Sequence, residues 1–144
     1  MNIPLYIIWS EENNLGIPIV DEQHRAIIST INTLHYFMRN KNGTMITSST
    51  VTILNEYTKF HFITEEGIIK NWKYPEAESH IKLHNELYIK TIDMTSKLRI
   101  HNDNSELLQF LKNWWIRHIC IEDKKYASFI LRRSLTDVDA DRNE

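Results

Sequence analysis

The sequence is poor in the residues that interrupt regular helices. It contains only three glycines and three prolines among its 144 residues. A β-barrel or β-sandwich needs many tight turns, and glycine and proline usually supply them. The scarcity therefore argues against these two folds and favours a few long helices.

Cysteine and long hydrophobic runs are scarce as well. Cys120 is the only cysteine, so no intramolecular disulfide can form, which is typical of a reducing compartment. No apolar run approaches the roughly 18 residues that span a bilayer. The first residues lack a basic leader, and Glu11 and Glu12 follow them at once, unlike a signal peptide. We therefore expect a cytoplasmic protein without a membrane partner.

Neither sign of charge dominates. The net charge is −2, and lysine and arginine are spread along the chain, so no nucleic-acid footprint is visible. The length suits one domain, expected as a monomer or a weak oligomer. We expect this domain to comprise an N-terminal segment over residues 1–17, a helical bundle over about 18–133 and a flexible tail over 134–144.

Four segments have the periodicity of amphipathic helices, because their apolar residues recur every three or four positions. The second begins after the Ser/Thr cluster 47–50, and Tyr74-Pro75 ends it. The predicted helices cover about residues 18–39, 51–73, 77–98 and 105–131. Short connections make successive helices antiparallel, so the sequence predicts an all-α, up-down-up-down four-helix bundle.

Histidines lie on the inward faces of these helices. Five of the seven histidines are placed in this way, although burying an unpaired imidazole or carboxylate costs several kcal/mol. His61 and Glu65 are four residues apart, about 40° of helical rotation, so both project the same way. His80 and His84 have the same spacing, and two imidazoles one turn apart can chelate a transition metal.

The remaining candidates are weaker individually. His118 and Asp123 are five residues apart, about 140° on an ideal α-helix, which does not put them on one face. A lone His24 on an apolar face is usually a hydrogen-bonded core histidine. A His-x-x-x-Glu pattern also arises by chance, and a histidine pair can simply line a core.

The combination is more informative than any pair, because every predicted helix supplies at least one ligand candidate. Seven protein ligands are too many for one ion but suit two ions that carboxylates bridge. Imidazole and carboxylate without thiolate favour iron, manganese or zinc. The candidate ligands are His24, His61, Glu65, His80, His84, His118 and Asp123.

These motifs resemble the hemerythrin family, and among its members the single-domain bacterial type. The similarity runs from about residue 9 to 130, and the ordered pattern H…H-x-x-x-E…H-x-x-x-H…H-x-x-x-x-D is very specific. The matching residues are Trp9, Leu15-Gly16-Ile17, Asp21-Glu22-Gln23-His24, His61-Phe62-Ile63-Thr64-Glu65-Glu66, Tyr74-Pro75, His80, His84, Trp114, His118, Asp123 and Tyr126.

The resemblance implies a di-iron centre. It assigns His80, His84 and His118 to one iron, and His24 and His61 to the other. Glu65 and Asp123 would bridge both irons, together with a solvent-derived oxo or hydroxo group. The first iron would then be six-coordinate, while the second would keep one position open. The resemblance further implies reversible binding of dioxygen there, as a hydroperoxide, for oxygen storage, delivery or scavenging rather than for enzymatic turnover.

An apolar lining would keep water and stray protons away from such a site. Six residues beside the ligand positions could provide it, although each could equally be plain core: Ile27, Ile28, Phe62, Trp114, Trp115 and Ile119. Tyr126, one turn past Asp123, is a candidate hydrogen-bond donor next to the ligands. The family commonly has leucine three residues before the fourth-helix histidine, where this chain has Trp115, whose bulk could narrow the pocket or slow exchange.

Two other functions remain open at this point. One is a di-iron oxidase or peroxidase, which five neutral imidazoles disfavour relative to the glutamate-rich sites of ferritin-like enzymes. The other is a sensor of oxygen, nitric oxide or redox state that acts on a separate partner. Outside the site, we expect His35 in the core or at a bundle end, a solvated His101, and Cys120 as a small apolar residue.

Overall fold

The computed structural model describes residues 2–39, 44–99 and 104–142; His101 lies outside them. Within these ranges every regular element is helical. The long helices are α1 (Pro18–Arg39), α2 (Thr44–Asn71), α3 (Ala77–Ser96), α4 (Ser105–Arg117) and α5 (Asp123–Asp141). The short elements are 3-10 turns at Glu11–Asn13 and Lys97–Arg99, and a π-helical turn at His118–Glu122.

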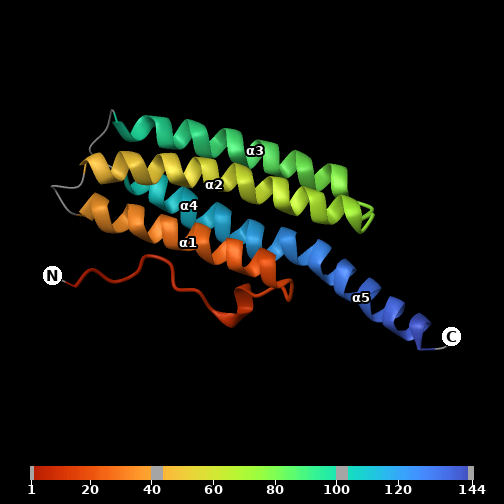
Figure 1. The fold of residues 1–144 in the computed structure, drawn as a ribbon. Helices are drawn as coiled ribbons and strands as arrows, with labels where there is room; N and C mark the ends of the chain where they lie inside the picture. Colours follow the sequence, from red (N-terminus) through yellow and green to blue (C-terminus); the bar gives the residue numbers. More distant parts are fainter. Residues whose placement is uncertain (1, 40–43, 100–103, 143–144) are drawn as a thin grey trace.

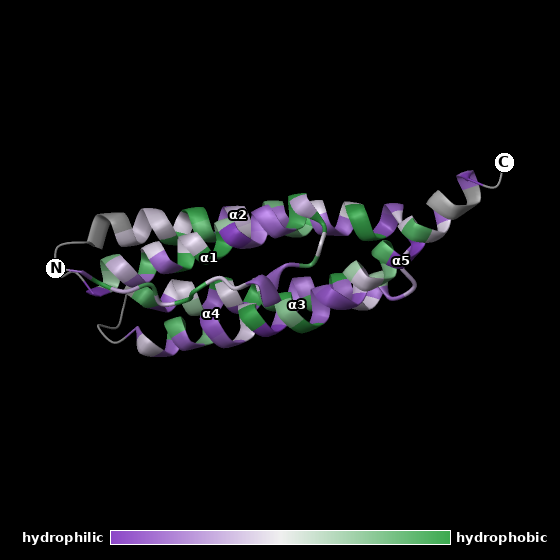
Figure 2. Cartoon of the chain, turned by 90° about the horizontal axis from the view of Figure 1, so that it is seen from below, coloured by the Kyte–Doolittle hydropathy of each residue, from purple (hydrophilic) through white to green (hydrophobic). Residues whose placement is uncertain are grey.

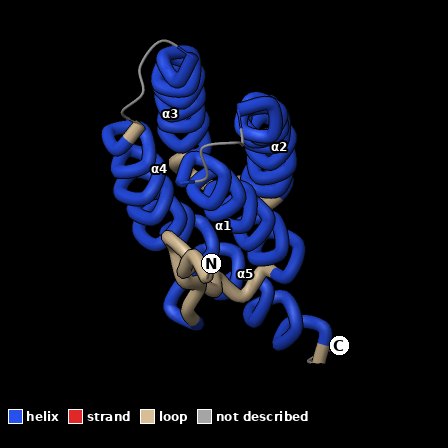
Figure 3. The backbone as a smooth tube through the Cα atoms, turned by 90° about the vertical axis from the view of Figure 1, so that its left-hand side faces the viewer, coloured by secondary structure: helices blue, strands red, loops and turns tan. Residues whose placement is uncertain are grey.

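Helices α1, α2, α3 and α4 alternate in direction and pack around a common centre (Figures 1 and 3). The π-helical turn joins α4 to α5, so these three elements form the fourth helix of the bundle, and the end of α5 projects beyond the other helices (Figure 1). The predicted all-α four-helix bundle is confirmed. No helix in the described part of the chain has the length and hydrophobicity needed to cross a membrane.

Two boundaries differ from the sequence prediction. Helix α2 begins at Thr44, so the Ser/Thr cluster 47–50 lies within it rather than before it. Hydroxyl side chains are tolerated inside a helix when they bond back to a carbonyl one turn earlier, as Thr52 Oγ1 does to the Ser48 carbonyl at 3.2 Å. Helix α5 continues to Asp141, well into the predicted tail. Flexibility of that tail stays a prediction.

The core consists of two apolar clusters separated along the bundle axis. The first includes Ile27, Ile28, Ile31, Leu34, Leu54, Phe62, Leu87, Leu111, Trp115 and Ile119. The second includes Leu15, Val20, Ile69, Tyr74, Tyr126, Ala127 and Ile130. Each buried aliphatic or aromatic side chain contributes about 1.5–3 kcal/mol to stability. The predicted ligands fall between the clusters: along α1, for example, Val20 precedes His24, and Ile27 follows it.

The N-terminal segment runs along the length of the bundle (Figure 2) and is held by side-chain amides and a carboxylate. The Asn32 amide donates to the Ile7 carbonyl and accepts from the Ile7 N–H, both at 2.8 Å. Asp21 accepts hydrogen bonds from the N–H groups of residues 15 and 16 at 2.7 and 3.1 Å. Asn13 donates to Cys120 Sγ at 2.8 Å, so Cys120 is also a hydrogen-bond acceptor that ties the segment to the π-helical turn.

Gly16 and Gly67 provide a matched pair of substitutions. Gly16 has φ +88°, and an added Cβ would lie 3.2 Å from Leu131 Cδ1. Gly16→Ala should therefore lower the free energy of unfolding by about 1–2 kcal/mol. Gly67 lies in α2 with no neighbour within 4 Å of an added Cβ, so Gly67→Ala should raise it by about 1 kcal/mol. Urea titrations of both variants test this, and equal effects would contradict it.

Candidate metal centre

All seven predicted ligands meet in one buried polar layer between the two apolar clusters. No side chain among them is more than 4% exposed. His24 comes from α1, His61 and Glu65 from α2, His80 and His84 from α3, His118 from the π-helical turn and Asp123 from the start of α5. The fold therefore brings together all seven residues that the sequence singles out as candidate ligands.

Their ligand atoms form two overlapping groups, within each of which all atoms lie within 4.8 Å of one another. The larger group contains three imidazoles and the smaller group two. The first is Glu65, His80, His84, His118 and Asp123; the second is His24, His61, Glu65 and Asp123. The two carboxylates thus belong to both groups.

Each carboxylate turns one oxygen towards each group. Glu65 Oε1 lies 3.0 Å from His84 Nε2, and Glu65 Oε2 lies 3.2 Å from both His24 Nε2 and His61 Nε2. Asp123 Oδ1 lies 3.0 Å from His80 Nε2, while Asp123 Oδ2 lies 3.0 Å from His24 Nε2. This is the arrangement that a carboxylate needs in order to bridge two cations.

The π-helical turn explains how His118 and Asp123 share a face. In an ideal α-helix their spacing would separate them by about 140°. Here the Asp123 N–H bonds to the His118 carbonyl five residues earlier, which widens the turn by one residue. His118 Nε2 then lies 3.1 Å from Asp123 Oδ1. Such single π turns are frequent at functional sites.

The donor atoms fit a bound cation. Six of the buried ligand atoms that face the centre have no hydrogen-bond partner among the described residues: Nε2 of His80, His84 and His118, Oε1 of Glu65, and both carboxylate oxygens of Asp123. Leaving such atoms unpaired costs about 1–3 kcal/mol each, and more when they are charged. Converging imidazole and carboxylate lone pairs are the ligands of divalent transition metals. The residues therefore satisfy the requirements of a metal centre.

Strong electrostatic coupling links the imidazoles and carboxylates. Burial by itself lowers the pKa of His24 and of His80, but contacts with Asp123 and Glu65 outweigh it and raise each pKa to about 9. Burial would raise the pKa of both carboxyl groups, but the surrounding histidines hold each pKa below its usual value. For His84, burial dominates and lowers the pKa, which favours the neutral imidazole.

Three side chains outside the ligand set form hydrogen bonds with ligand residues. The Tyr126 hydroxyl, the donor expected from the sequence, lies 2.7 Å from Glu65 Oε2, and its own pKa is raised by burial and by Glu65. Gln23 Oε1 lies 2.7 Å from His61 Nδ1, and Glu66 Oε1 lies 3.3 Å from His84 Nδ1. Sequence reasoning missed these last two roles, although both residues directly adjoin ligands.

The six residues expected to line the site lie in two different environments. Ile27, Ile28, Phe62, Trp115 and Ile119 are buried in the first apolar cluster. Phe62 stacks on His84 at 3.9 Å between ring centroids and on Trp115 at 5.6 Å. Trp115 is fully buried, so its bulk occupies the interior next to this stack.

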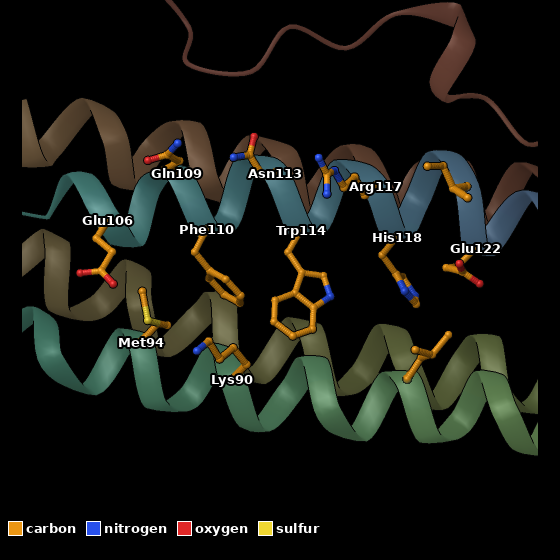
Figure 4. A pocket seen from close by; sticks show the side chains of 12 residues that line it. Lys90, Met94, Glu106, Gln109, Phe110, Asn113, Trp114, Arg117, His118 and Glu122 are labelled. Atoms are coloured by element: carbon orange, nitrogen blue, oxygen red, sulfur yellow. The ribbon is translucent and has the colours of Figure 1, made fainter.

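Trp114 lies instead in a surface groove of about 650 Å³ between α3 and α4. Figure 4 shows Phe110, Trp114 and His118 projecting towards α3, with Lys90 and Met94 opposite. The groove thus reaches one ligand of the larger group. His35 lies outside both groups; it is buried and stacks on Tyr6 at 4.8 Å, as expected of a core histidine.

Fold and site together define a four-helix bundle with a cation-binding centre of histidines and carboxylates. The profile of the hemerythrin HHE cation binding domain matches residues 15–130. The chain is 29% identical to the bacteriohemerythrin of Pseudomonas paraeruginosa, over 96% of this chain and 90% of that protein. It is 30% identical to the bacteriohemerythrin of Stenotrophomonas maltophilia, over 84% and 79%. The chain therefore belongs to the hemerythrin family.

More distant relatives also match over most of the chain. A hemerythrin of Sipunculus nudus is 27% identical over 89% of this chain and 97% of that protein. The crystal structure of a wild-type hemerythrin superposes with a TM-score of 0.77 at 23% identity, covering 85% of this chain and 96% of that one. At this identity the structural match establishes the fold.

The raised histidine pKa values predict how the metal-free protein responds to alkaline pH. Protonated His24 and His80 stabilise the fold fully below about pH 6.5, and this contribution is lost as the pH rises through about 9. We expect the Tm of the metal-free protein to be several degrees lower at pH 9.5 than at pH 6. Metal binding requires neutral imidazoles, so loading should remove or reverse the difference. Equal Tm values of the metal-free protein at pH 6 and pH 9.5 would contradict the proposed coupling between these histidines and the carboxylates.

Proposed function

We propose that this chain is a non-haem di-iron protein that binds dioxygen reversibly. The observation that carries the proposal is the pair of overlapping ligand groups, which share two carboxylates but differ by one imidazole. His80, His84 and His118 would hold one iron, and His24 and His61 the other, with Glu65 and Asp123 bridging both. The smaller group would leave a coordination position free for a small ligand.

Iron at this centre would supply the electrons that dioxygen takes up on binding, and return of those electrons would release it. The side chains around the centre would exclude water from it and hold its charged ligands in a fixed orientation. Phe62 and Trp115 form a stacked apolar wall beside His84, which supports exclusion of water. Tyr126 holds Glu65 through a 2.7 Å hydrogen bond, so that one bridging carboxylate is kept in orientation.

The donor set supports binding rather than enzymatic turnover. Five neutral imidazoles and two carboxylates stabilise highly charged iron less than a glutamate-rich set does, so cleavage of the O–O bond is disfavoured. The names of the relatives, hemerythrin and bacteriohemerythrin, agree with this choice. We also propose a cytoplasmic location, which fits the single cysteine.

An optical experiment tests the function. The protein is loaded with ferrous iron without air, oxygen is admitted, and the sample is then purged with argon. We expect a visible band that develops with oxygen and fades on purging. His61→Ala, which leaves the smaller group one imidazole, should abolish the band, while His35→Gln should retain it. A parent protein without a band would contradict the proposal, and irreversible oxidation would favour redox sensing.

Trp115 gives a second prediction. Its ring is fully buried and stacks on Phe62, which stacks on His84, so the indole fills space beside the centre. Trp115→Leu should speed both association and release of dioxygen by about tenfold, since a cavity opens where the larger indole ring packs. Stopped-flow and flash-photolysis rates measure this, with the exposed Phe60→Leu as the control. Unchanged rates in Trp115→Leu would exclude a gating role.

A further inference from the structure

The two ligand groups differ in the partners of their outer imidazole nitrogens. In the smaller group, His61 Nδ1 lies 2.7 Å from the neutral amide oxygen of Gln23. In the larger group, His84 Nδ1 lies 3.3 Å from a carboxylate oxygen of Glu66. One imidazole of each group is thus supported from outside, but by partners of different charge.

The orientation of Gln23 is fixed at both ends of its amide. Its Nε2 donates to Thr64 Oγ1 at 3.3 Å, which leaves Oε1 to accept from His61. His61 therefore carries its proton on Nδ1, and the Nε2 lone pair remains available to a metal ion in the smaller group. Gln23 is buried, so this interaction is shielded from water.

Glu66 acts on His84 in the same direction but with a negative charge. A carboxylate can only accept, so it too places the imidazole proton on Nδ1 and the lone pair of Nε2 towards the centre. Phe62 stacks on the same ring at 3.9 Å with an interplanar angle of 12°, which fixes the ring plane. The Glu66 side chain is 23% exposed, so its charge is only partly screened.

We propose that Glu66 and Gln23 are positioning residues that make the two metal positions electronically unequal. Glu66 makes His84 the stronger donor, and Gln23 leaves His61 the weaker one. This inference rests on the proposed di-iron function. Its physical basis is that a hydrogen bond to an anion increases electron density on the imidazole, and so stabilises the more highly charged metal, more than a bond to a neutral amide does.

This asymmetry would give the two metal positions different preferred oxidation states. Stabilisation of the ferric state near His84 would favour the transfer of an electron towards a bound ligand. The weaker donation by His61 would keep the position with the free coordination site closer to the ferrous state, which is the state that takes up dioxygen. Glu66 would thereby strengthen oxygen binding without touching the ligand.

The primary test is Glu66→Gln, which keeps the size and the acceptor of the side chain but removes its charge. We expect the ferric-to-ferrous equilibrium of the iron-loaded protein to shift about tenfold towards ferrous. For a one-electron couple this is a rise of about 59 mV in midpoint potential. Glu56→Gln, at an exposed position on the same helix, controls for the loss of a charge alone. Equal potentials in the two variants would overturn the proposal.

A metal-free measurement separates this inference from the oxygen-binding function. In ¹⁵N-labelled protein without metal, we expect the His84 ring nitrogens to report an Nδ1–H tautomer whose proton resonance moves upfield in Glu66→Gln and stays in place in Glu56→Gln. An unmoved resonance in Glu66→Gln would overturn the proposed contact even if the parent protein binds oxygen. A parent protein that shows no oxygen-dependent band, but in which both the resonance and the potential respond to Glu66→Gln, would refute the function and retain the inference.

Discussion

Burial of two carboxylates in the middle of the bundle is the constraint on which the rest of the structure depends. Glu65 and Asp123 have no exposed surface, and an isolated charge in such a place would be strongly destabilising. Five imidazoles from all four helices surround them, so each helix must arrive at the centre in the correct register. The π-helical turn, the outer hydrogen bonds and the polar layer between two apolar clusters are consequences of this requirement.

The same layer separates two kinds of surroundings. On one side, Phe62 and Trp115 stack beside His84 and make an apolar wall. On the other side, Tyr126 bonds to Glu65 and packs within the second apolar cluster. The groove between α3 and α4 reaches His118 from the surface. The surroundings of the polar layer are therefore apolar beside His84, hydrogen-bonding beside Glu65, and reached by a surface groove beside His118.

The helices and the ligand pairs His61–Glu65 and His80–His84 were predictable because their spacing follows helical periodicity. Residues 18–39 and α1 coincide, since one apolar stripe and Pro18 define that helix. The face shared by His118 and Asp123 was not predictable, because an α-helical wheel has no place for a π turn. The roles of Gln23 and Glu66 were also missed: each depends on a contact between residues 38 or 18 positions apart, which spacing within one helix does not encode. A polar residue at a buried position beside a ligand was the available signal for Gln23.

We propose that these seven side chains define two iron positions, one with three imidazoles and one with two. A crystal structure of the iron-loaded protein, with anomalous differences measured above and below the iron edge, tests it most directly. We expect two anomalous peaks, one contacting His80, His84 and His118 and the other contacting His24 and His61, with Glu65 and Asp123 contacting both. A single peak, or two peaks that share no carboxylate, would contradict it.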